Sequence, residues 1–342
     1  MHKHGGDVYN YKDIIDFSTN INLMGMPEGV IRGAYEGVDL SQNYPDPYCL
    51  ELREAISEYE NVNVEEIICG NGAADLIFSL SFSRKPKKAL VLAPTFYEYE
   101  KALRASGCQI EYFYLSEEKG FVIEENFINS LVEDIDMVFL CNPNNPTGEL
   151  IKKDFIYRII KRCAEKNIFL VVDECFMYFV ENQSEYSVKE FAKGYRNLFI
   201  LKAFTKIYAM PGLRLGYGIC SNKEVLEKMY EISQPWSISI PAQRAGINAL
   251  KETEYVENSL KVLKEEKEYL INELLKKEFK IYGSNANYIF FKVNSSDFFE
   301  ECLKKGFLIR DCSNYKGLEK GYYRIAVKKH YENIKFINSI SL

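Results

Sequence analysis

Short apolar segments alternate with longer amphipathic ones through the middle of the chain, and this alternation limits the possible folds more than any other feature. The predicted strands, rich in β-branched and aromatic residues, are 87–94, 108–115, 136–143, 168–174, 197–204 and 214–220. Helical periodicity lies between most of them, for example at 97–106 and 152–166. The alternation predicts an α/β fold with a mostly parallel sheet covered by helices on both faces. Functional side chains are then expected at the carboxyl ends of the strands.

The pattern changes in the last third of the chain. Residues 241–277 predict one long helical stretch dense in Glu and Lys. After it, strands are predicted at 279–283, 287–293, 307–312 and 322–327, with helices between them. Because a chain of 342 residues usually divides, we expect a large domain over 40–240 and a smaller α+β domain built from 1–39 and 241–342.

Composition excludes several classes of partner. The net charge of -6 comes from scattered Lys and Glu, so neither nucleic acid nor a membrane surface is expected as a partner. The nine cysteines are odd in number and form no C-x-x-C pair, which is typical of reduced thiols, and no metal site is predicted. The polar start of the chain and the lack of an apolar run of about 18 residues predict a cytoplasmic protein.

A glycine-rich turn within residues 69–80, CGNGAADLIFSL, leads directly into a predicted helix. The N–H groups of that helix's first turn, at Ala73 and Ala74, can bind a phosphate with help from the helix dipole. An ordinary turn before a helix is the alternative, and this motif alone does not decide between them.

The segment LCNPNNPTGEL, residues 140–150, follows a predicted strand. Its prolines and glycine force an irregular turn and leave Asn142, Asn144 and Asn145 with amides that can donate or accept. A simple turn is the alternative, although the density of proline favours a loop made rigid for a function.

Two further strand ends carry charged groups. Asp173 and Glu174 end an apolar strand, where a carboxylate is costly unless a cation or a strong donor pairs with it; a helix cap is the competing explanation. Lys206 follows another predicted strand, and Arg214 begins the next. A lysine in a partly apolar site can become a nucleophilic amine, whereas a surface lysine is the alternative.

Together these groups favour pyridoxal phosphate (PLP), which requires a phosphate site, a partner for its pyridine nitrogen, a donor to its ring hydroxyl and an amine for its aldehyde. The segments GNGAAD, APTFYEY, NPNNPTG, VVDE and FTKIYAMPGLRLGYG resemble the motifs of the fold-type I, class I/II aminotransferases, and the resemblance covers nearly the whole chain. It implies a seven-stranded-type, mostly parallel sheet, a smaller domain built from both termini, and a homodimer with a shared active site.

The resemblance also implies roles for single residues. Lys206 would bind the cofactor aldehyde, Asp173 would pair with the pyridine nitrogen, and Asn145 would donate to the ring hydroxyl. Phe96 would stack on the ring. The groups around the cofactor phosphate would be Ala73, Ala74, Thr205, Arg214 and, from the partner subunit, Tyr44. Arg324 would bind the substrate carboxylate as a bidentate fork.

Finer features are similar to one branch of the family. The segments HGGD, DFSTNINLMGMP, QPWSIS and LIRDCSNYKGL look like threonine-phosphate decarboxylases of cobalamin synthesis. A phosphorylated substrate needs positive or donor groups beyond those of the cofactor site, and His4, Asn20 and Arg310 are the candidates. Histidinol-phosphate aminotransferases usually carry a tyrosine where this chain has Phe176, and the family often has a hydroxyl residue at the position of Ala203.

The sequence therefore favours decarboxylation of L-threonine O-3-phosphate to aminopropanol phosphate. A histidinol-phosphate-type aminotransferase that uses 2-oxoglutarate is the alternative. A cofactor-binding protein without turnover is a third possibility, but Lys206, Asp173, Asn145, Arg214 and Arg324 together argue against it.

Overall fold

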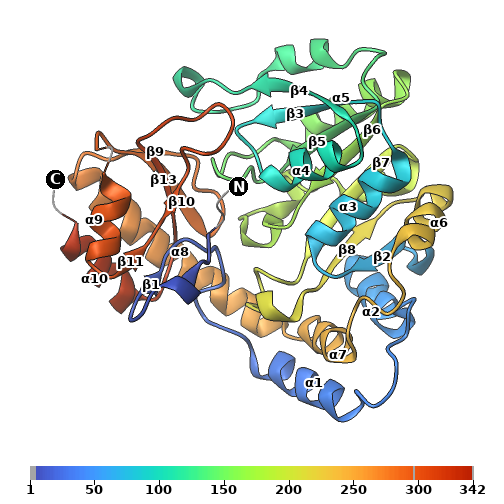
Figure 1. Ribbon diagram of the computed structural model, residues 1–342, viewed down its shortest axis with the longest axis horizontal. Helices are drawn as coiled ribbons and strands as arrows, with labels where there is room; N and C mark the ends of the chain where they lie inside the picture. The colour runs from blue at the N-terminus through green and yellow to red at the C-terminus, as the bar shows by residue number, and fades with distance from the viewer. Residues whose placement is uncertain (1–4, 296, 341–342) are drawn as a thin grey trace.

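The computed structural model describes residues 5–295 and 297–340, which form a large sheet and a smaller one lying side by side (Figure 1). The large sheet has seven strands in the order β2-β8-β7-β6-β5-β3-β4. Its strands are β2 (Ile67–Gly70), β3 (Lys88–Ala93), β4 (Gln109–Tyr114), β5 (Met137–Cys141), β6 (Phe169–Asp173), β7 (Leu198–Ala203) and β8 (Gly216–Ile219). The predicted α/β fold and its seven-stranded sheet are confirmed.

Pairing in this sheet is parallel except around β8, which runs antiparallel to both β7 and β2. The central strands are continuous apolar runs because both of their faces are buried. Along β6, Val172 packs in one buried cluster while its neighbour Val171 packs in another. This alternation places a core on each face of the sheet.

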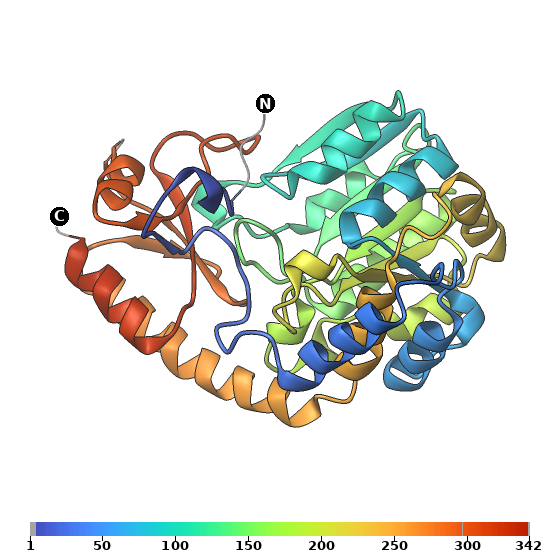
Figure 2. The same cartoon turned by 60° about the horizontal axis from the view of Figure 1, so that its bottom comes forward.

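Helices cover both faces of the large sheet (Figure 2). They are α2 (Leu50–Glu60), α3 (Ala73–Arg84), α4 (Tyr97–Ala105), α5 (Lys153–Glu165) and α6 (Lys223–Ile232). The helices predicted at 97–106 and 152–166 are confirmed as α4 and α5. Within the ranges that the structure describes, no helix has the length and apolar character needed to cross a membrane.

The smaller sheet is antiparallel, with the order β12-β13-β10-β9, and lies beside a two-stranded parallel pair of β1 and β11. These strands are β1 (Ile15–Asp16), β9 (Lys280–Tyr282), β10 (Tyr288–Lys292), β11 (Phe307–Leu308), β12 (Arg310–Asp311) and β13 (Tyr322–Ala326). The helices near them are α9 (Phe298–Lys304) and α10 (His330–Ser339). Ile15 pairs with Phe307, so the start of the chain contributes a strand to this part of the molecule. The domain boundaries at residues 40 and 241 stay a prediction.

The single long helix expected over 241–277 is wrong. The structure has two helices there, α7 (Ile240–Ala249) and α8 (Thr253–Lys276). The backbone N–H groups of Lys251 and Glu252 bond to carbonyls three residues back, which tightens the end of α7 and lets the chain turn. Before the turn, α7 packs against α1 (Glu28–Asp39), and after it α8 continues to the smaller sheet.

Candidate active site

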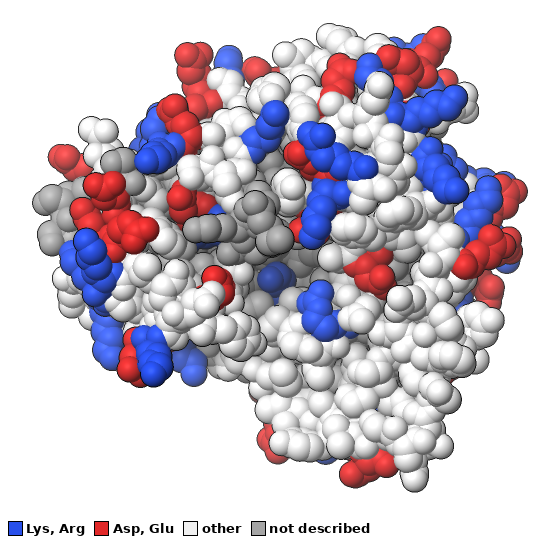
Figure 3. Space-filling view, viewed as in Figure 1, with Lys and Arg blue, Asp and Glu red and all other residues white. Residues whose placement is uncertain are grey.

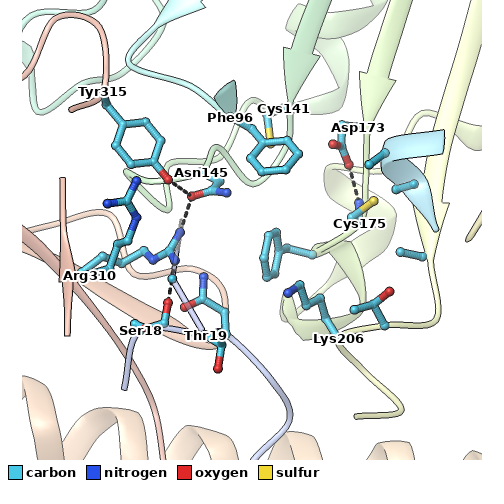
Figure 4. Close-up of a pocket in the computed structure, with 18 of the residues that line it drawn as sticks. Ser18, Thr19, Phe96, Cys141, Asn145, Asp173, Cys175, Lys206, Arg310 and Tyr315 are labelled. Atoms are coloured by element: carbon cyan, nitrogen blue, oxygen red, sulfur yellow. Dashed lines mark hydrogen bonds between the residues drawn. The ribbon is translucent and has the colours of Figure 1, made fainter. Parts of the chain in front are cut away.

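A cavity of about 260 Å³ opens where the carboxyl ends of the large sheet face the smaller one. Lys and Arg side chains lie in and beside a hollow near the middle of the face seen in Figure 3. Most of the predicted site residues line this cavity: Asn20, Ala73, Ala74, Phe96, Asn145, Asp173, Thr205, Lys206, Arg214, Arg310 and Arg324. Segments from both ends and the middle of the chain, from Asn20 to Arg324, therefore converge on one cavity, as Figure 4 shows.

Lys206 lies in the turn after β7, and its amine points into the cavity (Figure 4). The pKa of this amine is lowered to about 8, first by burial and then by the nearby guanidinium groups of Arg324 and Arg214. The amine also lies 5.9 Å from the ring centroid of Phe176. A lysine in such a site is a nucleophilic amine at near-neutral pH.

Asp173 ends β6 and is only 4% exposed. Burial raises the pKa of its carboxyl, and two donors partly offset that effect. The N–H of Cys175 donates to Oδ1 at 2.9 Å, and the hydroxyl of Tyr99 donates to Oδ2. Strong hydrogen-bond donors therefore stabilise the carboxylate. The sequence predicted either a cation or a strong donor as the partner of this group.

The loop after β5 separates the three predicted asparagines by role. Asn142 bonds the backbone of Ile151 through both ends of its amide, and Asn144 donates to the carbonyl of Pro94. Those two asparagines make the loop rigid. Of the three, Asn145 alone lines the cavity, where its Oδ1 accepts a hydrogen bond from Nη1 of Arg324.

Arg324 comes from β13 of the smaller sheet and is 6% exposed. Its Nη2 donates to the carbonyl of Ser18 at 3.0 Å, whereas Nε is buried without a partner among the described residues. A fixed guanidinium with unused donor capacity can bind a carboxylate.

The start of α3 forms a cradle at the other end of the cavity. Ala73 is its first residue, as predicted, and Gly72 before it has φ +83°. A Cβ at Gly72 would lie 2.5 Å from Nη2 of Arg214, so the guanidinium approaches the helix start closely. Unpaired N–H groups and an arginine at one helix N-terminus suit a phosphate. Arg214 lies two residues before β8, not at its start as the sequence predicted.

Asn20 and Arg310 line the side of the cavity near the smaller sheet. Asn20 is 2% exposed, and its Oδ1 has no hydrogen-bond partner among the described residues. The guanidinium of Arg310 lies 4.9 Å from the ring centroid of Tyr315 and donates to Asn314 at 2.8 Å. Both positions suit groups that contact a substrate.

Among the described residues, one predicted site residue, Tyr44, does not line this cavity. Tyr44 is 79% exposed and packs instead against Trp236, with ring centroids 4.7 Å apart. His4 lies outside the described residues. Phe176 and Ala203, which depart from the family pattern, both line the cavity and bring no hydroxyl to it.

Sequence reasoning missed several lining residues: Gly5, Ser18, Thr19, Cys141, Cys175 and Tyr315. Ser18, Thr19 and Tyr315 lie inside the segments DFSTNIN and LIRDCSNYKGL, so position within those segments was an available signal. Among the residues that the structure describes, no three His, Cys, Asp or Glu side chains are grouped as a metal ion would require.

The family model for aminotransferase class I and II matches residues 12–340. The chain belongs to this family. A Caldanaerobacter subterraneus protein that carries the threonine-phosphate decarboxylase name provisionally is 37% identical over 344 residues, covering 99% of this chain and 93% of that protein. The threonine-phosphate decarboxylase of Salmonella typhimurium is 33% identical, covering 96% and 90%. The crystal structure of the histidinol-phosphate aminotransferase from Clostridium acetobutylicum has a TM-score of 0.88 and 36% identity, covering 94% and 97%.

Membership makes this chain a PLP-dependent enzyme of fold type I, as the sequence predicted. The cavity independently fits that cofactor. It combines an amine of lowered pKa, a buried carboxylate and a helix N-terminus beside an arginine, which are the groups that an aldehyde, a pyridine nitrogen and a phosphate require.

Proposed function

We propose that the protein decarboxylates L-threonine O-3-phosphate to aminopropanol phosphate. The observation that carries this proposal is the placement of three guanidinium groups around one cavity, those of Arg214, Arg310 and Arg324. A cofactor phosphate, a substrate carboxylate and a substrate phosphate are three anions, one for each arginine. Similarity to two proteins that carry the threonine-phosphate decarboxylase name supports this choice.

On this proposal, bound PLP supplies an electron sink for the bond that breaks at the substrate α-carbon. Lys206 would hold the cofactor aldehyde, and its amine would move a proton to or from the substrate α-carbon. Asp173 would keep a proton on the pyridine nitrogen, and Asn145 would donate to the ring oxygen. Phe96 would stack on the ring. The phosphate contacts come from Ala73, Ala74, Thr205 and Arg214.

The residues that anchor the substrate would determine which reaction takes place. Arg324 binds the carboxylate, while Arg310 and Asn20, with His4, bind the phosphate. Because bound PLP would weaken the α-carbon bond perpendicular to its ring, the relative position of these anchors would decide between loss of CO2 and loss of a proton.

A histidinol-phosphate-type aminotransferase is the second candidate, because the Clostridium acetobutylicum aminotransferase is 36% identical with a TM-score of 0.88. Histidinol phosphate has a phosphate but no carboxylate, so in that reaction Arg324 would serve the keto-acid partner, 2-oxoglutarate. The two candidate functions use the same cofactor site and differ in the substrates bound next to it.

Mass spectrometry decides between the candidates. The PLP-loaded enzyme is incubated with L-threonine O-3-phosphate, and in parallel with histidinol phosphate and 2-oxoglutarate. CO2 release with retention of the amine supports the decarboxylase. Glutamate formation without CO2 would make the enzyme an aminotransferase and leave the cofactor site intact.

We also propose that the enzyme is a cytoplasmic homodimer in which Tyr44 reaches the cofactor phosphate of the partner subunit. Large apolar side chains are exposed along α1 and the residues after it, including Tyr35, Val38, Tyr44 and Tyr48. Such a patch favours association. All nine cysteines are free thiols, as a reducing compartment would keep them. Light scattering coupled to size exclusion tests the dimer; an active monomer would refute the shared site.

A further inference from the structure

A cluster of charged side chains lies buried against the large sheet, on the face opposite Asp173. We call Glu60, Glu174, Lys202, Tyr178 and Tyr217 the Glu60 cluster. The side chains of Glu60, Glu174 and Lys202 are 1%, 0% and 3% exposed. None of the five lines the cavity, and the proposed function uses none of them.

Hydrogen bonds and ion pairs connect the cluster completely. The amine of Lys202 lies 3.2 Å from Oε1 of Glu60 and 3.5 Å from Oε2 of Glu174. Glu60 also accepts from the hydroxyls of Tyr178 and Tyr217, and the Lys202 amine lies 4.8 Å from the Tyr178 ring centroid. Burial raises the pKa of Glu60, but the Lys202 and Lys189 ammonium groups outweigh it and lower that pKa to about 2.

The cluster is attached to both turns that carry the reactive groups. Glu174 follows Asp173 directly, and its carboxylate accepts from the hydroxyl of Ser187 and the N–H of Val188. Glu174 and Tyr178 lie on either side, in the sequence, of Phe176, which lines the cavity.

The turn that carries Lys206 rests on the same cluster from the other side. The ring of Tyr217 packs against Phe204, with centroids 5.4 Å apart, and Phe204 packs against Tyr208. In the sequence, Lys206 lies between Phe204 and Tyr208, and Lys202 lies four residues before Lys206, on β7. A shift of Glu60 would therefore move the supports of Asp173 and Lys206 together.

Stability alone does not account for this arrangement. Desolvation of buried charges costs about as much as their attraction returns, and apolar side chains of similar volume often stabilise a protein as well or better. A polar network in which every group is satisfied instead makes a core rigid and specifies one arrangement of it.

We propose that Glu60 and Lys202 are positioning residues, which fix the distance between the turn of Asp173 and the turn of Lys206. This inference rests on the proposed cofactor site, but not on whether the enzyme is a decarboxylase or an aminotransferase. The residues touch neither cofactor nor substrate and act through Glu174, Tyr178 and Tyr217.

The test uses the double variant Glu60→Gln/Lys202→Met, which removes one charge of each sign and keeps the approximate volume. Its matched control is Lys88→Met/Glu111→Gln, a pair 2.7 Å apart that joins β3 and β4 away from the cavity. Apo-protein of each is titrated with PLP, and the visible absorbance band of the loaded protein is followed against pH. Circular dichroism checks that each protein is folded.

We expect the folded double variant to bind PLP about tenfold or more weakly and to shift the pH midpoint of the band by about half a unit or more, whereas the control stays within about twofold of wild type. A folded double variant with wild-type affinity and midpoint would overturn the inference. If it does not fold, Tyr217→Phe removes one hydroxyl from Glu60 and keeps the ring; unchanged binding in that variant would overturn it equally. Failure of the wild-type protein itself to bind PLP would instead refute the proposed function.

Discussion

Among single residues, Lys206 has a protonation state that differs between the folded and unfolded chain. Its pKa falls from the ordinary value of 10.5 to about 8 in the folded protein, first through burial. Between these values the unfolded chain binds more protons, so the apo-protein gains stability as pH rises from about 8 to about 10.5. Lys206→Met should remove this dependence and raise the stability of the apo-protein at pH 7 by about 2 kcal/mol, after discounting for partial solvent access.

Urea unfolding of apo-protein at pH 7 and pH 10 measures this effect. Lys228→Met, at an exposed lysine on α6, is the control and should keep the wild-type pH dependence. A Lys206→Met protein that still gains stability over the same pH window would show that another group causes it.

A second prediction at this scale concerns Arg324→Lys. This substitution keeps the positive charge but removes the planar guanidinium fork. The guanidinium bonds both Asn145 and the carbonyl of Ser18, and a lysine cannot keep both bonds and also bind a carboxylate in two places. Arg324→Lys should lower kcat/KM for L-threonine O-3-phosphate by about 10- to 100-fold, with PLP affinity nearly unchanged. Arg158→Lys, at a surface ion pair with Glu125, is the control. Equal losses in both variants would contradict the proposed contact.

Sequence reasoning placed Asn145, Asp173 and Lys206 at or just after strand ends, and all three line the cavity. It expected a cation or a donor for each strand-end carboxylate, and the structure supplies donors for Asp173 and Lys202 for Glu174. The partner of Glu174 could not be named, because only the pairing of β6 with β7 brings residue 202 near residue 174.

At the scale of elements, the junction of Gly72 and α3 determines how closely Arg214 approaches the helix start. Gly72→Ala introduces a Cβ at φ +83° and 2.5 Å from the guanidinium. Gly107→Ala introduces the same kind of strain at φ +82° with no atom within 4 Å. Both variants should lose about 1 kcal/mol of stability. Only Gly72→Ala should also weaken PLP binding, by about tenfold, because it displaces Arg214.

Thermal unfolding and PLP titration of the two glycine variants separate strain from displacement. Equal PLP affinity in both would mean that Arg214 contributes little to the phosphate site.

Elements with a long, continuous sequence pattern were predictable. Short elements, and those defined by their contacts with distant parts of the chain, were not. The central strands were found as apolar runs, whereas the four residues of β2 were missed because their neighbours, not their pattern, define them. The break between α7 and α8 contains no Gly or Pro, so the sequence carries no local signal for it. It arises where α7 leaves its contacts with α1 and α8 begins those with the smaller sheet.

Across the whole molecule, the two sheets must keep a fixed relation, because one carries Lys206 and the other Arg324. The 3-10 turn Glu117–Lys119 after β4 makes one connection: Glu117 accepts hydrogen bonds from Tyr282 and Tyr322, and from Lys292 at 2.9 Å. These bonds, that of Tyr282 first, hold the pKa of Glu117 well below its usual range. Phe121 inserts beside them among the rings of the smaller sheet, 5.6 Å from Phe290.

Glu117→Gln should loosen this connection, because a neutral amide cannot pair with the lysines that the carboxylate attracts. Tyr322 lies two residues before Arg324 on β13, so the looser connection should act on substrate binding. We expect KM for the substrate to rise about 3- to 10-fold with kcat changed less than about twofold. Backbone amides of β9 and β10 should also exchange faster with deuterium.

Glu125→Gln, which removes a surface pair with Arg158 and no contact between the sheets, is the matched control and should change neither quantity. Faster exchange without a change in KM would mean that Arg324 is positioned by Asn145 and Ser18 alone. Unchanged exchange would mean that the contacts which the variant leaves intact suffice to hold the sheets together; these include Phe121, the bond of Tyr288 to the backbone of Asn144 and that of Asn285 to the carbonyl of Gly148.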